Sequence, residues 1–182
     1  MADPDPVLLD ACVLYPPVLR EIVTRCAADG LFVPLWSPRI LAEWAHAAAR
    51  SGTEAGNEIA RLRASFPQAE VLPDPGIEAT LTLPDPADAH VLAAALAGGA
   101  ARIVTLNLRD FPARALAPHG RVALSTDDFL MGLWLDRPDT VEAVVADARA
   151  EASRCNGQTP ALRAFLRRAS LPRLGKALSR HG

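Results

Sequence analysis

The strongest constraint on the fold is an alternation of short apolar runs with longer segments of helical periodicity. Val7-Leu8-Leu9 ends at Asp10, and a second apolar run, Arg102–Leu106, ends before Asn107. Short apolar runs bounded by turn or helix-start residues are typical of buried strands. Strands that alternate with helices predict an α/β fold with a parallel sheet covered by helices. An all-helical protein is the alternative, because such runs do not separate a buried strand from a buried helix.

Pairs of a capping residue and a proline indicate where helices begin. Ser37-Pro38 and Asp85-Pro86 each combine an N-cap with proline at the first helical position. Further strands are expected at Leu31–Trp36, Ala69–Leu72 and Val122–Leu124. Helices are expected at residues 18–28, 40–50, 54–66, 87–97, 113–117, 140–154, 160–168 and 171–178, and from Thr126.

Composition excludes several classes of protein. The 182 residues are 50% hydrophobic and 22% charged, which is ordinary for a globular chain. The 3 cysteines form no CxxC pair, which argues against a disulfide framework and fits a reducing, cytoplasmic compartment. The start of the chain has no basic region before its apolar run, and no apolar stretch is long enough to span a bilayer. No phosphate-binding glycine loop and no zinc-type histidine spacing is present.

The charge is distributed unevenly. Residues 1–136 carry 10 basic and 17 acidic side chains, whereas residues 137–182 carry 9 basic and 4 acidic ones. Arg137-Pro138-Asp139 therefore suggests a boundary between a domain at 5–135 and a helical, basic extension at 137–182. The favoured interpretation of the basic extension is a solvated helical tail, and the alternative is a surface that faces a polyanion or an acidic partner.

Acidic residues fall where the strands of a parallel sheet end, which is where such sheets bind ligands. Asp10 and Asp110 follow two predicted strands, Asp88 lies in the first turn of an apolar helix, and Glu43 lies inside another helix. Carboxylates that meet at one edge suit Mg²⁺ or Mn²⁺. Each acid also has a structural explanation: turn or helix capping for Asp10, Asp85 and Asp88, or pairing with a nearby arginine for Glu43 and Asp110.

The order and the residue patterns of these segments resemble those of a known family. The stretches VLLDACVLYPPVLREIV, SPRILAEWAHAAAR and LPDPADAHVLAAALAGGAARIVTLNLRDFP are similar to the PIN-domain ribonuclease family, specifically to the VapC-type toxins of bacterial toxin–antitoxin pairs. The resemblance covers about residues 5–135. The segment STDDFLMGLW matches one branch of the family, and the tail from about 137 resembles the helical extension of some members of that branch.

The resemblance implies a PIN-like parallel β-sheet flanked by helices, with an α-helical C-terminal extension. It also implies an endoribonuclease that needs Mg²⁺ or Mn²⁺ and serves as the toxin of a type II toxin–antitoxin pair. Asp10, Glu43 and Asp88 match three acids of the family's metal site. The place of a fourth acid holds Asn107, and Asp110 follows three residues later, so either could complete the site. Asp85 is an additional acid close by.

The expected partners are RNA and a cognate antitoxin protein, while a homodimer is left open and no membrane is expected. Trp36 and Trp44 are weighed as antitoxin anchors against the favoured interpretation that both are buried. The tail's apolar residues Leu162, Phe165, Leu166 and Ala169 keep helical spacing, so one face should pack on the catalytic domain. Six arginines are candidates for binding RNA phosphates: Arg39, Arg50, Arg109, Arg163, Arg167 and Arg168.

Two other functions stay open on the sequence alone. Loss of a full metal site at Asn107 would leave a catalytically silent PIN-fold module that binds RNA or docks a partner. A metal-dependent nuclease of DNA repair is the third alternative.

Overall fold

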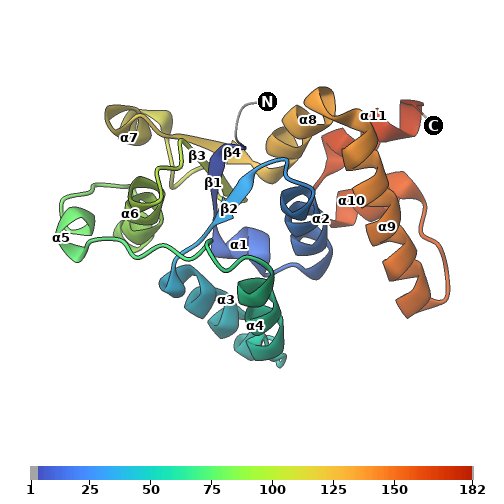
Figure 1. Cartoon of the computed structure of the whole chain (residues 1–182), viewed down its shortest axis with the longest axis horizontal. Helices are drawn as coiled ribbons and strands as arrows, with labels where there is room; N and C mark the ends of the chain where they lie inside the picture. Colours follow the sequence, from blue (N-terminus) through green and yellow to red (C-terminus); the bar gives the residue numbers. More distant parts are fainter. Residues whose placement is uncertain (1–3, 182) are drawn as a thin grey trace. The chain divides into compact units, whose positions relative to one another are not determined.

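Parallel pairing of short apolar strands organises the N-terminal part of the chain. In the computed structural model, which describes residues 4–181 apart from the side chains of Asn156 and His181, four strands form one sheet in the order β2-β1-β3-β4 (Figure 1). β1 pairs in parallel with both β2 and β3, with Leu8 opposite Leu35 and Ile103. The strands are β1 (Pro6–Leu9), β2 (Val33–Leu35), β3 (Arg102–Thr105) and β4 (Val122–Ser125). The predicted α/β class is confirmed, and the all-helical alternative is wrong.

The chain divides into two compact units. The first contains the described residues up to Tyr15 together with Phe32–Leu124, and the second contains Pro16–Leu31 together with the described residues from Ser125 onward. The second unit thus includes a helix from near the start of the chain. The expected division into domains at 5–135 and 137–182 stays a prediction.

Two helices of the first unit begin where the Ser37-Pro38 and Asp85-Pro86 signals predict. The Ser37 hydroxyl accepts a hydrogen bond from the Ile40 amide, at 3.2 Å, and Asp85 Oδ1 accepts one from the Ala87 amide, at 2.9 Å. The predicted strand Ala69–Leu72 is reduced to a single bridge between Trp36 and Glu70. The elements are α1 (Ala11–Leu14), α3 (Pro38–Arg50), α4 (Gly56–Ser65), α5 (Pro75–Glu78), η1 (Pro86–Asp88), α6 (Ala89–Ala97), α7 (Ala113–Leu116) and η2 (Ala117–His119).

The apolar helix α6 is the main cover of the central strands. It packs on β1 and β3. Its residues from Ala89 to Ala95 are all buried, which explains why its sequence is apolar on every face. Trp36 and Trp44 are also buried, with 0% and 1% of their surface exposed. The antitoxin-anchor interpretation of these two tryptophans is therefore wrong, and the favoured core interpretation is confirmed.

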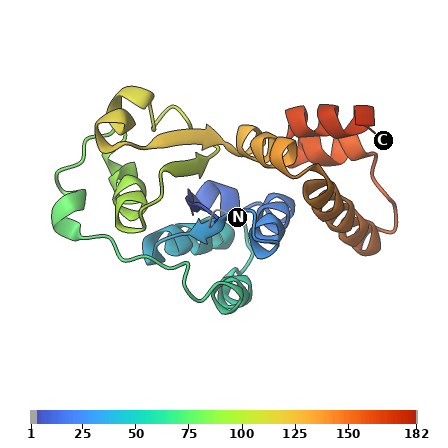
Figure 2. The ribbon, with the colours of Figure 1, turned by 45° about the horizontal axis from the view of Figure 1, so that its top comes forward.

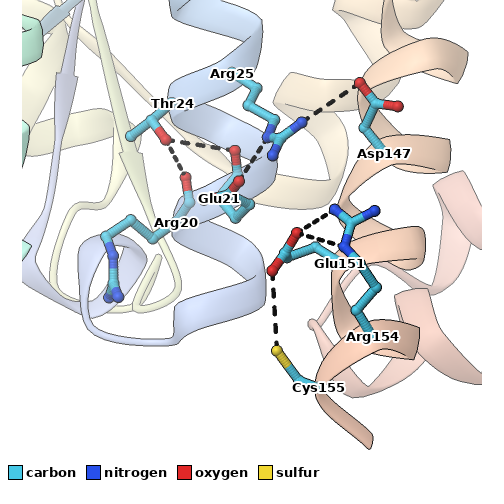
Figure 3. Close-up of polar contacts among 8 residues, drawn as sticks. All are labelled: Arg20, Glu21, Thr24, Arg25, Asp147, Glu151, Arg154 and Cys155. Carbon is cyan, nitrogen blue, oxygen red and sulfur yellow. Dashed lines mark hydrogen bonds and ion pairs between the residues drawn. The ribbon is translucent and has the colours of Figure 1, made fainter. Parts of the chain in front are cut away.

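The second unit is entirely helical. Helix α9 packs on α2 and on α8, and α10 packs on α11 (Figure 2). Figure 3 shows the polar contacts of α2 and α9: Arg25 lies 2.5 Å from Glu21 on its own helix and 3.4 Å from Asp147 on α9. The helices are α2 (Pro17–Ala28), α8 (Thr126–Asp136), α9 (Pro138–Asn156), α10 (Leu162–Arg168) and α11 (Pro172–His181).

The two faces of α10 differ as its periodicity predicts. Phe165 and Leu166 are buried, whereas the arginines on the opposite face are exposed. Among the described residues, no helix is both long enough and apolar enough to cross a membrane.

A buried carboxylate joins two helices of the second unit. Asp127, on α8, is only 7% exposed and accepts hydrogen bonds from the backbone amides of Arg173 and Leu174, at 2.8 and 3.0 Å. These amides lie in the first turn of α11, where backbone N–H groups have no partner inside the helix. Asp127 therefore caps α11 from a different helix, and its negative charge suits the positive end of the helix dipole.

We expect Asp127→Ala to lower the free energy of unfolding by about 1–3 kcal/mol, because two amides lose a charged acceptor in a buried place. Urea unfolding followed by circular dichroism measures the change. Asp136→Ala is the matched control, because Asp136 is exposed at the end of the same helix and should change stability by less than about 0.5 kcal/mol. Equal unfolding midpoints for wild type and Asp127→Ala would contradict the capping role.

Candidate metal centre

The adjacent strands β1 and β3 bring Asp10 beside Thr105. The Asp10 amide donates to the Val104 carbonyl, at 3.1 Å, which continues the pairing of the two strands. The Asp10 carboxylate accepts from the Thr105 hydroxyl at 2.7 Å, from the Ala11 amide at 2.6 Å and from the Cys12 thiol at 3.1 Å. The capping role suggested by the sequence is thus present. The same bonds hold the carboxylate of Asp10 in one orientation at the edge of the sheet.

The thiol of Cys12 is a hydrogen-bond donor to the Asp10 carboxylate. Burial, followed by the nearby charge of Asp10, raises the pKa of Cys12 to about 12. The thiol is therefore protonated at neutral pH and can donate to Asp10, and it is not a nucleophile.

Three further acids converge in the same unit. Asp85, Asp88 and Asp110 each place one carboxylate oxygen within 4.8 Å of those of the other two. Asp85 precedes the short helix η1, Asp88 is its last residue, and Asp110 lies in the loop after β3. Asp85 also caps η1, as its position before proline predicts. Residues 25 and 22 positions apart along the chain thus form one acidic cluster, which we call the Asp85–Asp88–Asp110 cluster.

The cluster is under electrostatic strain. Burial, followed by the neighbouring charges of Asp10, Asp85 and Asp110 in that order of size, raises the pKa of Asp88 to about 6, while His90 acts in the opposite direction. Like charges at this spacing favour a bound proton or a bound cation. Carboxylate oxygens are the ligands that Mg²⁺ and Mn²⁺ prefer. The donor set and its mutual repulsion both fit a hard divalent cation.

Asn107 and Asp110 are in direct contact. The side-chain amide of Asn107 donates to the carboxylate of Asp110, and the backbone amide of Asn107 donates to the Thr105 hydroxyl, at 3.0 Å. Asp110 contributes an oxygen to the acidic cluster. Asn107 lies one step away and fixes the orientation of Asp110. Which of the two completes a metal site stays a prediction.

Glu43 lies outside the three-acid cluster and has its own contacts. Its Oε1 is 2.8 Å from Nε2 of His90 and 3.6 Å from Nε of Arg39. The Arg39–Glu43 pair predicted from helical spacing is confirmed. Arg39 also donates to Glu78, at 3.0 Å, and to the Ala87 carbonyl, at 3.2 Å. Arg39 is therefore bound to protein groups, and its role toward RNA phosphates stays a prediction.

The other predicted phosphate-binding arginines are exposed. Arg50 ends α3, and Arg109 lies in the loop after β3 between Asn107 and Asp110. The tail residues Arg163, Arg167 and Arg168 belong to the second unit. The three acids and Arg109 belong to the first unit. Arg109 directly precedes Asp110 and is therefore the basic side chain closest in sequence to the cluster.

Comparison with known families adds to this geometry. The family model of the PIN domain matches residues 6–109. The chain belongs to the PIN domain family. No curated protein matches the sequence. PIN domains are generally metal-dependent nucleases, and the acidic cluster lies at the sheet edge where a parallel α/β fold places its ligands.

Sequence reasoning missed one residue of this PIN domain. His90 is 1% exposed and contacts Glu43, a residue 47 positions earlier. The spacing of the histidines argues only against a zinc site and assigns His90 no role. A usable signal was present, because His90 is the one polar residue within the apolar run of α6. An imidazole buried in such a helix requires a polar neighbour.

The raised pKa of Asp88 predicts how pH and metal act together. The unfolded chain has the ordinary value of 3.8, so the folded protein binds the extra proton between about pH 4 and 6. The contribution of Asp88 to stability is therefore complete below pH 4 and is lost as the pH rises to about 6. Without metal, the melting temperature of Asp88→Asn should fall less over this range than that of wild type. Mn²⁺ should raise the wild-type melting temperature more at pH 7.5 than at pH 5, because protons compete with the cation.

Thermal unfolding with Mn²⁺ and with a chelator measures both effects. Asp74→Asn is the matched control, because Asp74 is an exposed acid of the same type that lies outside the cluster. It should behave as wild type does. Identical Mn²⁺ stabilisation of wild type and Asp88→Asn at both pH values would contradict the assignment.

Proposed function

We propose that this PIN domain is an endoribonuclease that depends on Mg²⁺ or Mn²⁺ and acts as the toxin of a type II toxin–antitoxin pair. The observation that carries the proposal is the convergence of Asp85, Asp88 and Asp110 in a fold whose family consists mainly of nucleases. Asp10 adds a fourth charge, since it contributes to the raised pKa of Asp88. Glu43 is the fifth acid of the proposed site.

Each residue has a distinct part in the proposed chemistry. A divalent cation would offset the charge of the acids. It would also lower the pKa of a water molecule, which could then lose a proton and attack a phosphodiester bond. Asp88 and Asp110 would hold the cation together with Asp10, which Thr105 and Cys12 keep in place. Asn107 would fix the orientation of Asp110.

The acidic edge repels RNA, so basic side chains must bind its phosphates. Arg50 and Arg109 are exposed in the first unit, and Arg163, Arg167 and Arg168 form an exposed basic face on α10. Aromatic residues make up only 5% of the chain, so base stacking makes a minor contribution to the proposed RNA binding. Recognition of RNA shape is therefore favoured over recognition of a linear sequence.

The proposed antitoxin is a small protein encoded beside this gene. Residues 1–136 carry 17 acidic and 10 basic side chains, which favours a partner that inserts a basic side chain into the acidic edge. Its apolar contacts would have to come from residues other than Trp36 and Trp44, since both are buried. We place the pair in the cytoplasm because 3 cysteines without a CxxC pair fit a reducing compartment.

The second candidate function is a catalytically silent module that binds RNA or a partner. It is favoured by Asn107, which occupies the place where the resemblance leads one to expect an acid. The two functions differ in metal-dependent cleavage. A nuclease of DNA repair is distinguished by its preference for DNA over RNA.

We expect Asp10→Asn and Asp88→Asn each to lower RNA cleavage by at least about 100-fold, because each removes charge where the cation would bind. Cleavage of total RNA with mapped 5′ ends, with and without Mg²⁺, measures the change. Expression of wild type alone should arrest growth, and neither variant should do so. Co-expression with the neighbouring gene should relieve the arrest and yield a complex.

Asp74→Asn is again the control and should cleave RNA as wild type does. Circular dichroism must show that both active-site variants are folded. Wild-type protein that is folded, harmless in the cell and inactive on RNA with Mg²⁺ or Mn²⁺ would favour the silent module.

The basic face of α10 should bind phosphates without contributing to catalysis. Replacing Arg163, Arg167 and Arg168 together by Ala should weaken binding to all RNA sequences and reduce the slope of log affinity against log salt by up to about 2. Fluorescence anisotropy at several salt concentrations measures the slope. The cleavage pattern should not change.

A triple variant of equal charge provides the control. Arg61, Arg114 and Arg137 are exposed elsewhere, and replacing them by Ala should have a smaller effect on the slope. If the α10 variant keeps the wild-type slope, the extension is a solvated tail or an antitoxin surface.

A further inference from the structure

His90 is an unusual residue in the core of the first unit. It lies on α6, where its neighbours Ala89, Val91 and Leu92 are buried and apolar. Its side chain is 1% exposed, and neither ring nitrogen has an aligned hydrogen-bond partner in the described part of the chain. A buried polar group without a partner costs free energy, and an apolar residue would avoid that cost. Packing alone therefore does not account for a histidine at this position.

Glu43 is a close polar neighbour of the imidazole. Nε2 of His90 lies 2.8 Å from Oε1 of Glu43. This is a hydrogen-bond distance, but the N–H of the ring is not aligned with the oxygen. The same oxygen is 3.6 Å from Nε of Arg39. Among the described residues, both contacts of this carboxylate go to Oε1. Oε2 takes part in neither of these two contacts.

His90 also lies close to the acidic cluster. It is two residues after Asp88 along the same turn of chain, and its charge is among those that act on the Asp88 carboxyl. No similar electrostatic effect of Glu43 on Asp88 is resolved. His90 thus contacts Glu43 and lies within electrostatic range of Asp88.

We propose that His90 is a positioning residue, which donates from Nε2 to Oε1 of Glu43 and so directs Oε2 of that carboxylate toward the cation. The inference rests on the proposed metal-dependent function. Groups that orient a metal ligand from behind typically change metal affinity 10- to 100-fold when they are removed. Arg39 supports the same carboxylate from its exposed side, and it is itself held by Glu78.

Three variants at one position test the role atom by atom. His90→Leu keeps the bulk and removes both nitrogens. His90→Gln can place its amide nitrogen where Nε2 lies, whereas the shorter His90→Asn places its amide nitrogen near Nδ1. We expect Mn²⁺ affinity, measured by isothermal titration calorimetry, to fall about 10- to 100-fold in His90→Leu and His90→Asn. His90→Gln should recover most of it.

Stability separates positioning from packing. His90→Leu should melt at the same temperature as metal-free wild type or higher, because leucine suits the apolar surroundings of α6 and neither nitrogen of His90 makes an aligned hydrogen bond in the described part of the chain. A structural role would instead lower the melting temperature. In a Glu43→Gln background, His90→Leu should cause no further loss of Mn²⁺ affinity, because the carboxylate through which His90 acts is gone.

The measurements distinguish failure of this inference from failure of the proposed function. Wild type that binds no Mn²⁺ would overturn both the function and this inference. Wild type that binds Mn²⁺, with His90→Leu binding equally well, would overturn the inference alone. Rescue by His90→Asn as good as that by His90→Gln, or full additivity with Glu43→Gln, would also overturn it.

Discussion

The parallel pairing of β1 with β3 is the constraint on which the site depends. It brings the end of β1 to the end of β3, so that Thr105 can donate to Asp10 at 2.7 Å. The loop after β3 then carries Asn107 and Asp110 to the same edge, and α6, packed on both strands, begins directly after Asp88. A slip of this pairing by one residue would turn Asp10 to the other face of the sheet. The apolar run of β1 and the acidity of the edge are therefore parts of one arrangement.

Electrostatics and packing oppose each other at this edge. Burial of Asp88 beside three other carboxyls destabilises the charged form, as the raised pKa of Asp88 shows. The protein partly offsets this with neutral donors, since Asp10 is held by a hydroxyl, an amide and a protonated thiol. Repulsion between neighbouring carboxylates of this kind is common at sites where a protein binds a ligand.

Local signals in the sequence predicted much of the fold and part of the site. Ser37-Pro38 and Asp85-Pro86 predicted helix starts because capping involves only neighbouring residues, and the ends of β1 and β3 predicted Asp10 and Asp110. Contacts between distant residues were not predictable in this way. His90 meets Glu43 across 47 positions, and Asp127 caps α11 across 46. The four-residue helices α1 and α5 were missed, whereas α7, which has the same length, was expected at 113–117, because so short a segment carries little periodicity.

The membership of α2 in the second unit has a consequence for synthesis on the ribosome. The partners of α2, among them α9, follow about 100 residues later in the chain. At a translation rate of about 5–20 residues per second, α2 waits roughly 5–20 s for them. The chain of the first unit is complete at Leu124, before any later helix of the second unit has been made. The acidic edge can therefore form on the nascent chain while the basic helices are still to come.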